Sequence, residues 1–301
     1  MRIVFMGTPD FAARALEQLY ADGHEIPAVF TRPGKPSGRG MRLTAPPVKQ
    51  LAEGKSLIYQ PDTLRGEAEK ILRDLAPELI AVVAYGKLLP REILELPPFG
   101  CVNIHASILP KYRGAAPIQR AILGGETATG VTSMYMSGEL DAGDIILTRE
   151  VEIGESETSG ELFERLSVLG AELLSETVAA IARGTAPRTP QNHAAASYAP
   201  PLTKDLSPID WHSSADEILC QIRALNPWPV ARTELFGREL KIFSARRGAV
   251  ATGTAGEIIS TGKDGIEVAC SGGSVLITEL QPPNSKRMSA AEYLRGHPPQ
   301  G

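Results

Sequence analysis

The chain has 301 residues, of which 43% are hydrophobic and 22% are charged, and this is close to the average for soluble globular proteins. The length predicts two domains, and a formal net charge of −4 excludes a chain that is basic overall. Three widely spaced cysteines, no signal peptide and no apolar run of about 20 residues argue against a disulfide framework, a cysteine metal site and a membrane span. We therefore expect a cytoplasmic monomer with reduced thiols and no membrane partner.

Apolar runs alternate with helical patterns through the first half of the sequence. Strand-like runs occupy residues 2–6, 26–30, 57–59, 79–84, 101–105 and 131–136. Helical patterns occupy residues 11–21, with Asp10 as the N-cap, and residues 46–52, 64–75 and 117–123. Residues 79–84 are apolar throughout, as in a central strand covered on both faces. The alternation predicts an α/β domain with a doubly wound, mostly parallel sheet.

A basic loop rich in glycine and proline follows the second predicted strand. No acidic residue occurs between Glu25 and Glu53. The basic residues of this window are Arg32, Lys35, Arg39, Arg42 and Lys49. A local positive field on an acidic protein can attract a phosphate backbone, although a solvated loop would have the same composition.

The second half changes character after a long amphipathic helix, predicted at residues 162–182. Residues 184–208 are rich in proline and predict a linker. A short helix at 213–224 precedes strand-like runs at residues 230–236, 240–245, 256–259, 265–270 and 275–280. Glycine-containing turns between these runs predict a small OB-like β-barrel. We divide the chain into a first domain at 1–183, a linker at 184–208 and a second domain at 209–301.

Three polar residues suit acyl transfer. Asn103 and His105 are two apart on a predicted strand, so they share a face, and they lie at the carboxyl end where open α/β sheets bind ligands. Asp141 lies downstream in a turn-like segment. When an amine attacks an acyl carbon, Asn103 can donate a hydrogen bond to the oxyanion and a protonated His105 can add positive charge. Asp141 can orient His105, favour its charged form and relay protons.

The same residues also have purely structural interpretations. His105 could be a satisfied strand residue, Asn103 could cap a turn, and Asp141 beside Gly143 could be turn chemistry. The segment from Ser107 to Pro110 predicts a rigid loop that either presents backbone groups to a flat polar ligand or only connects two elements.

The segment VNIHASILPKYRG at residues 102–114, together with LDAGD at 140–144, resembles the folate-dependent formyltransferases. The resemblance implies that 10-formyltetrahydrofolate is the formyl donor, that no metal is required, and that Asn103, His105 and Asp141 carry catalysis. The folate would contact the loop equivalent to the family's Ser-Leu-Leu-Pro, which here is Ser107, Ile108, Leu109 and Pro110. Backbone near Tyr85 and Gly86 would line the pterin pocket.

Further segments are similar to the family members that formylate the methionyl group of initiator tRNA. They are VFMGTPDFA at 4–12, GAAPIQR at 114–120, GVT at 130–132, IDW at 209–211 and ALNPWP at 224–229. RPGKPSGRG at residues 32–40 is similar to the loop that enters the acceptor stem in those members, which implies that initiator methionyl-tRNA is the partner. The implied tRNA-binding residues are Arg32, Lys35, Arg39, Arg42 and Lys204, with Arg39 as the most important. From Lys204 onward, however, eleven basic residues are balanced by eleven acidic ones.

Four alternative functions are weighed against this interpretation. The acceptor could be glycinamide ribonucleotide or an amino sugar nucleotide, but such acceptors need neither a basic loop nor a second domain. A hydrolase could release formate from formyl-folate with the same catalytic residues. A tRNA-binding module would have no need of Asn103, His105 and Asp141. A nicotinamide-dependent dehydrogenase is disfavoured because the glycine fingerprint after the first strand is absent.

Overall fold

The computed structural model describes residues 1–37, 42–249 and 253–297. The chain forms two compact units, each made of three segments. Unit 1 contains Met1–Pro117, Thr129–Val151 and Phe163–Ala199, and unit 2 contains Ile118–Ala128, Glu152–Leu162 and Pro200–Gly301. The proline-rich segment is shared between them, because its part up to Ala199 belongs to unit 1.

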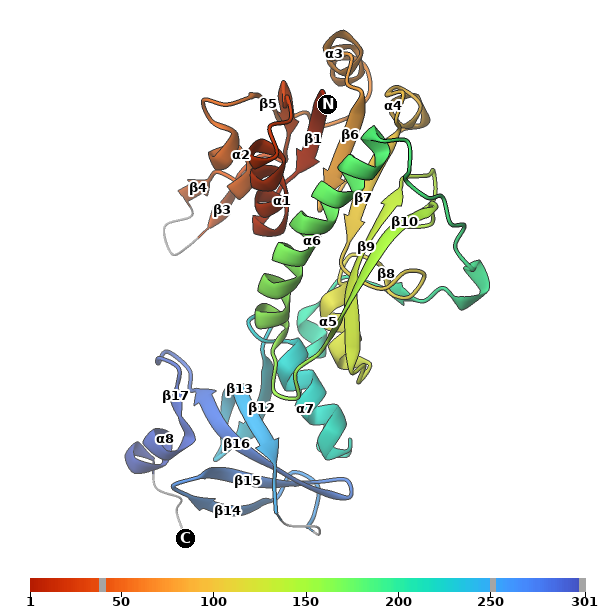
Figure 1. Ribbon diagram of the computed structural model, residues 1–301. Coiled ribbons are helices and arrows are strands. Elements are labelled where there is room, and N and C mark those ends of the chain that lie inside the picture. Colours follow the sequence, from red (N-terminus) through yellow and green to blue (C-terminus); the bar gives the residue numbers. More distant parts are fainter. Residues whose placement is uncertain (38–41, 250–252, 298–301) are drawn as a thin grey trace. The chain divides into compact units, whose positions relative to one another are not determined.

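A seven-stranded sheet forms the centre of unit 1 (Figure 1). Its order is β10 (Ile145–Glu152), β9 (Ala128–Tyr135), β7 (Cys101–His105), β6 (Leu79–Val83), β1 (Ile3–Gly7), β2 (Ala28–Phe30) and β5 (Leu57–Tyr59). The five strands from β7 to β5 are parallel, whereas β9 runs antiparallel to β7. The mostly parallel sheet predicted from the sequence is therefore confirmed.

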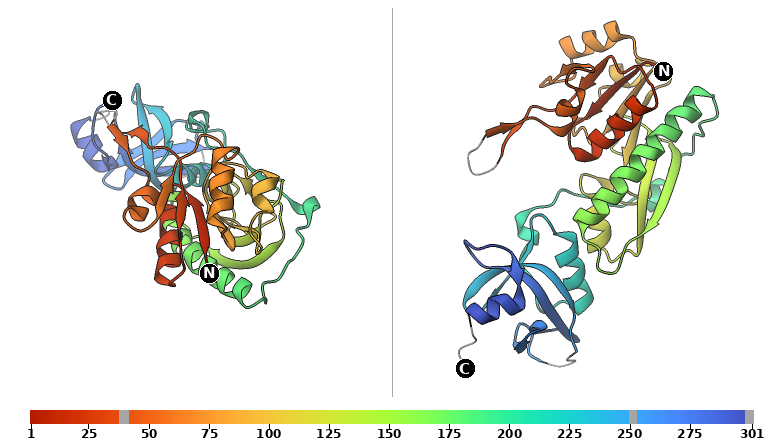
Figure 2. Two further views of the ribbon diagram at one scale, coloured as in Figure 1. Left: turned by 90° about the horizontal axis from the view of Figure 1, so that it is seen from above. Right: turned by 60° about the vertical axis from the view of Figure 1, so that its left-hand side comes forward.

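Helices cover both faces of this sheet (Figure 2). Helices α3 (Glu67–Leu75) and α4 (Arg91–Leu94) pack on one face, where Val4, Met6 and Ile80 share a core with residues of both helices. Helices α1 (Asp10–Ala21) and α6 (Ser159–Ala182) lie on the other face, where the rings of Phe11 and Phe163 meet edge to face at 5.5 Å. Because both faces are covered, β1 and β6 are buried along their whole length.

Some local predictions differ from the structure. Asp10 is not the N-cap of α1: Pro9 holds that position without a side-chain cap, and Asp10 is the first helical residue, where its carboxylate interacts favourably with the helix dipole. Helix α3 begins at Glu67 because Gly66 before it has a φ of 68°. The basic loop contains two short antiparallel strands, β3 (Lys35–Ser37) and β4 (Arg42–Thr44). Arg39 lies outside the described residues.

Short elements complete unit 1 and connect it to the rest of the chain. They are α2 (Pro47–Ala52), β8 (Arg113–Gly114), a 3-10 helix at His193–Ala195 and β11 (Tyr198–Ala199). Helix α5 (Pro117–Leu123) belongs, apart from Pro117, to unit 2. Strand β11 pairs in parallel with β8, so the end of the proline-rich segment is hydrogen-bonded beside the loop that follows β7.

Unit 2 is built on an antiparallel sheet, as its alternating pattern predicts. The order is β12 (Ala231–Leu235), β13 (Arg238–Arg247), β16 (Gly273–Gln281), β15 (Gly265–Cys270) and β14 (Ile258–Gly262), and β17 (Met288–Ser289) also pairs with β16. Helices α7 (Ala215–Ala224) and α8 (Ala290–Gly296) both begin with a capping box and pack on this core. A 3-10 helix at Lys204–Leu206 precedes α7.

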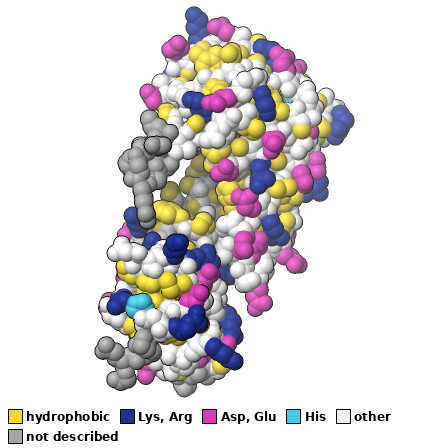
Figure 3. Space-filling view, turned by 90° about the vertical axis from the view of Figure 1, so that its left-hand side faces the viewer, with side chains coloured by type: hydrophobic (Ala, Val, Ile, Leu, Met, Phe, Trp, Pro, Cys, Tyr) yellow, Lys and Arg dark blue, Asp and Glu magenta, His cyan; other side chains and the backbone are white. Residues whose placement is uncertain are grey.

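The surface of unit 2 carries charges of both signs. On the face shown in Figure 3, Lys and Arg side chains lie among Asp and Glu side chains. Three of its arginines form ion pairs, Arg232 with Glu239, Arg247 with Asp216 and Arg287 with Glu279. Within the described part of the whole chain, no helix is long and apolar enough to cross a membrane, and no group of three His, Cys, Asp or Glu residues is placed to hold a metal ion.

Candidate active site

Strand β7 places Asn103 and His105 on the sheet face that α3 and α4 cover. Cys101, at the start of the same strand, belongs to the apolar core on that face. Side chains alternate along a strand, so Asn103 and His105 point the same way as Cys101, and each is nearer the carboxyl end. The apolar core therefore gives way to polar side chains toward that end of β7.

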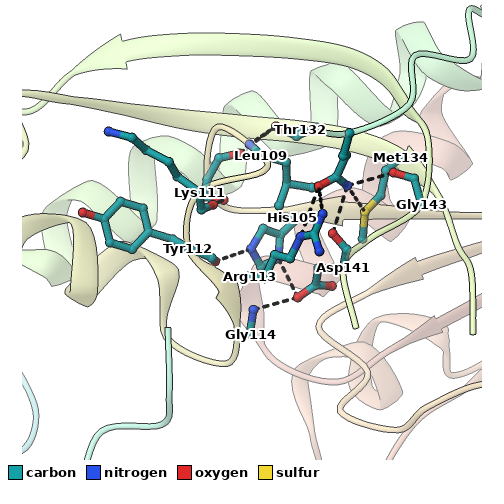
Figure 4. A network of polar contacts seen from close by, with 12 residues as sticks. His105, Leu109, Lys111, Tyr112, Arg113, Gly114, Thr132, Met134, Asp141 and Gly143 are labelled. Atoms are coloured by element: carbon teal, nitrogen blue, oxygen red, sulfur yellow. Dashed lines mark hydrogen bonds and ion pairs between the residues drawn. The ribbon is translucent and has the colours of Figure 1, made fainter. Parts of the chain in front are cut away.

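His105 is buried between two oxygen atoms (Figure 4). Its Nε2 lies 2.8 Å from the carbonyl oxygen of Tyr112, and its Nδ1 lies 3.7 Å from Oδ2 of Asp141. A carbonyl oxygen can only accept, so Nε2 carries a proton and donates it to Tyr112. Nδ1 is then the nitrogen that can gain or lose a proton. At 3.7 Å, Nδ1 is too far from Asp141 for a direct hydrogen bond, so it is available to a ligand.

Asn103 is half-buried beside His105. Among the residues that the structure describes, none forms a hydrogen bond with its side-chain amide. A polar group in this position without a protein partner is available to a ligand oxygen or to water.

Asp141 is held by contacts to its backbone and to its carboxylate. Its φ is 48°, in the left-handed region, and its Oδ2 accepts the N–H of Gly114 at 2.8 Å. The carbonyl oxygens of Asp141 and Gly143 both accept from Nε2 of Gln191, at 2.9 and 2.8 Å. Oε1 of Gln191 accepts from Arg113, with Nη2 at 2.6 Å. The structure thus brings Asp141 to His105, and Asn103 lies two residues before His105 on the same face of β7.

Gln191 and Arg113 are the site residues that the sequence analysis missed. Both are buried, with 6% and 3% of their surface exposed. Arg113 lies within the motif at 102–114, which is the one signal that could have drawn attention to it. Gln191 lies in the proline-rich segment. Its contact with Asp141 joins residues 50 positions apart, and such a contact produces no periodic pattern in the sequence.

The predicted folate loop is rigid, and only part of it faces outward. Ser107 is fully buried, and its hydroxyl donates to the carbonyl oxygen of Lys111 at 2.7 Å. Thr132 on β9 donates to the Ser107 carbonyl and accepts the N–H of Leu109, which is also buried. Ile108 and Pro110 are half-buried. The side chains open to a ligand are therefore those of Ile108 and Pro110.

The two other predicted folate residues lie at the carboxyl end of β6. Tyr85 is 1% exposed and packs in the core under α3 and α4, so its side chain does not face a ligand. Its hydroxyl has no hydrogen-bond partner among the residues described, and burial raises the pKa of Tyr85 to about 12. Gly86 is exposed with a φ of 75°, and a Cβ there would lie 3.1 Å from Nη1 of Arg32.

The residues predicted to bind tRNA occupy different parts of the chain. Arg32 is exposed at the end of β2, and its N–H donates to the hydroxyl of Thr8 after β1. Lys35 belongs to β3 and Arg42 to β4. Lys204 is exposed in the 3-10 helix of unit 2. Arg32 is placed beside a predicted folate residue, Gly86.

Two family profiles match almost the whole chain. The family described as formyl transferase matches residues 1–178, and the formyl transferase C-terminal domain matches residues 201–298. The chain is 50% identical over 301 residues to the methionyl-tRNA formyltransferase of Moorella thermoacetica, covering 99% of this chain and 97% of that protein. It is 46% identical to the methionyl-tRNA formyltransferase of Acetivibrio thermocellus, with the same coverage of both chains.

Solved structures share the fold at lower sequence identity. HypX from Aquifex aeolicus in complex with tetrahydrofolic acid has a TM-score of 0.66 at 20% identity, over 98% of this chain and 47% of that one. The N-formyltransferase from Helicobacter canadensis in complex with folinic acid and dTDP-3-aminofucose has a TM-score of 0.68 at 18% identity, over 93% of this chain and 98% of that one.

The buried hydroxyl of Tyr85 gives a prediction about alkaline stability. The unfolded chain loses the tyrosine proton near the ordinary pKa of 10.0, whereas the folded chain keeps it to about 12. Because the unfolded chain releases this proton before the folded chain does, the stability of the fold is unaffected below pH 10 and falls as the pH rises from 10 toward 12. Replacing Tyr85 by Phe removes this loss, and at pH 7 it is neutral or stabilising by up to about 1 kcal/mol because the hydroxyl has no partner.

The measurement is urea unfolding of the wild type and Tyr85→Phe, followed by far-UV circular dichroism between pH 7 and 11.5. The stability of the wild type should fall relative to the variant only above pH 10. Parallel curves over the whole range would show that the phenol ionises as freely in the folded chain as in the unfolded one.

Proposed function

The chain belongs to the formyl transferase family, and on this premise we propose that it transfers a formyl group from 10-formyltetrahydrofolate to the amino group of methionyl initiator tRNA. The relatives named as methionyl-tRNA formyltransferases support this acceptor, since they match 99% of the chain at 46% and 50% identity. The solved HypX and N-formyltransferase structures, bound to tetrahydrofolic acid and folinic acid, support a folate donor.

The observation that carries the chemistry is the amide of Asn103, which has no hydrogen-bond partner in the described part of the chain, on the same strand face as His105 of the His105–Asp141 pair. The methionyl amine attacks the formyl carbon bound to N10 of the folate, and the carbonyl oxygen becomes an oxyanion. Asn103 donates a hydrogen bond to that oxygen, and a proton on Nδ1 of His105 adds a second donor. Donors fixed in a partly dry site stabilise this charge without reorganising, which is where most of the rate enhancement arises.

Asp141 manages the protons in this scheme. The attacking amine gives up a proton as its nitrogen becomes positive, and N10 must gain one as the bond from N10 to the formyl carbon breaks. Asp141 accepts the first and returns it to N10, directly or through one water molecule. The products are N-formylmethionyl-tRNA and tetrahydrofolate, and the step balances without a metal ion or a redox partner.

The two substrates contact different segments of the chain. The pterin of the donor lies against Ile108, Pro110 and the backbone of Tyr85 and Gly86. Arg32 and the hairpin of β3 and β4, which carries Lys35, Arg39 and Arg42, contact the acceptor stem of the tRNA, and Lys204 adds a contact from unit 2. Positive charges concentrated in one hairpin of an acidic protein attract the phosphate backbone locally.

The test of this function is the transfer of labelled formyl from 10-formyltetrahydrofolate to different acceptors. We expect label on initiator methionyl-tRNA and none on free methionine, glycinamide ribonucleotide or a dTDP-amino sugar. Label released as formate in every reaction, with none on the tRNA, would make the protein a hydrolase. Label on a small amine alone would assign a different acceptor.

The proposed role of His105 predicts that His105→Ala lowers kcat by about 100-fold or more, because one oxyanion donor is lost. His193→Ala is the matched control, since His193 is exposed on a 3-10 helix of the same unit. Single-turnover formyl transfer at saturating substrates measures the effect. If a folded His105→Ala enzyme keeps the rate of the control, His105 has no part in the chemical step.

The proposed hairpin contact predicts that Arg39→Ala raises KM for the tRNA about tenfold and leaves KM for the folate unchanged, since a phosphate contact is removed. Arg91→Ala is the control, because Arg91 is a well-exposed arginine on α4. Steady-state kinetics at two salt concentrations should also show a smaller salt dependence for Arg39→Ala. An equal rise in both KM values would contradict the assignment.

A further inference from the structure

We propose that Gln191 is a positioning residue that sets the distance between Asp141 and His105. This inference rests on the proposed function, because it assigns Gln191 a part in the same reaction without contact with either substrate. Figure 4 shows the arrangement, in which one buried amide connects Arg113 to the turn that carries Asp141.

The turn at residues 141–143 requires outside support. Asp141 has a φ of 48°, in the left-handed region, which Asp tolerates better than most L residues but which is still less favourable than a negative φ. A Cβ on Gly143 would lie 1.8 Å from the carbonyl oxygen of Tyr135, so the turn is pressed against β9. If Asp141 relaxed to a negative φ, its carboxylate would leave both the N–H of Gly114 and the Nδ1 of His105.

Gln191 supplies this support through its two N–H groups. Its Nε2 donates to the carbonyl oxygens of Asp141 and Gly143, which lie on either side of residue 142. These two bonds fix the orientation of the peptide groups that bound the turn. Because the side chain is buried, a lost bond leaves a carbonyl oxygen without a replacement from bulk water.

Arg113 determines which way the amide of Gln191 faces. Both Nε and Nη2 of Arg113 donate to Oε1 of Gln191, at 3.2 and 2.6 Å. A guanidinium has only donors, so the amide oxygen must face Arg113 and the nitrogen must face the turn. Within the described part of the chain Arg113 forms no ion pair, and its charge polarises the amide and strengthens the two bonds that Nε2 donates.

The segment that carries Gln191 is tied to both sides of the site. Before Gln191, Thr189 exchanges two backbone hydrogen bonds with Ile145, which follows the Asp141 turn. After it, Ser197 accepts the N–H of Tyr112 on its side chain and the N–H of Arg113 on its carbonyl. The carbonyl of Tyr112 in turn holds His105. Thr189, Gln191 and Ser197 therefore fix the partners of both His105 and Asp141.

The test compares Gln191→Glu with the wild type. The substitution keeps the size of the side chain and an oxygen partner for Arg113, but it replaces the donor to the turn by a second acceptor. We expect kcat to fall by roughly 10- to 100-fold, as for a displacement of about 1 Å near the reacting atoms. KM for folate and for tRNA should stay within about threefold, because Gln191 touches neither. His193→Ala, on the same segment, is the control.

A second measurement separates positioning from a general loss of structure. If Gln191 acts through Asp141, then Gln191→Glu added to Asp141→Asn lowers the residual rate no further, whereas independent effects multiply. Arg113→Lys replaces the two guanidinium N–H donors to Oε1 of Gln191 by a single ammonium group, so it should lower kcat by about three- to tenfold. This variant serves as the test if Gln191→Glu does not fold. A variant with a lower melting temperature but a kcat within twofold of the wild type would overturn the inference. A wild type that transfers no formyl to tRNA would instead overturn the proposed function.

Discussion

The pairing of β7 with a parallel strand on one side and an antiparallel strand on the other is the constraint on which the candidate site depends. Asn103 is opposite Val82 of β6 and Met134 of β9, and His105 is opposite Thr132. The parallel side aligns the carboxyl ends of β7 and β6, and the antiparallel side provides Thr132, which holds the Ser107 loop. A slip of one residue would send Asn103 and His105 to the face that α6 covers.

Periodic burial explains which parts of this structure could be predicted. The bounds of β7, α5 and β15 agree with the sequence pattern, because apolar runs of the right length end at polar or glycine residues. The short strands β3 and β4 could not be predicted, since three residues each, with Pro36 inside β3, give no alternating pattern in the sequence. Asn103 and His105 could be placed on one face by spacing alone. Gln191 could not be identified in this way, because its partners are distant in the sequence and come near it only in the folded chain.

The charge distribution is consistent with an acidic protein that meets a polyanion at few points. In unit 2 the ion pairs of Arg232, Arg247 and Arg287 offset much of its positive charge, so this unit presents no uniformly basic surface on the face of Figure 3. The window from Glu25 to Glu53 has no acidic residue to do the same. Phosphate attraction in the proposed complex is therefore concentrated in a short segment, and its salt dependence should correspond to a small number of phosphate contacts.

The neutral amide of Gln191 also separates two charged side chains, those of Arg113 and Asp141. A buried guanidinium and a buried carboxylate attract each other strongly, and a direct pair between Arg113 and Asp141 would satisfy both. Such a pair would also draw the carboxylate away from Nδ1 of His105. With Gln191 between them, Arg113 is satisfied by an amide oxygen, and Oδ2 of Asp141 accepts the N–H of Gly114. The carboxylate stays 3.7 Å from His105, close enough to act on the imidazole and free to exchange a proton with a bound amine.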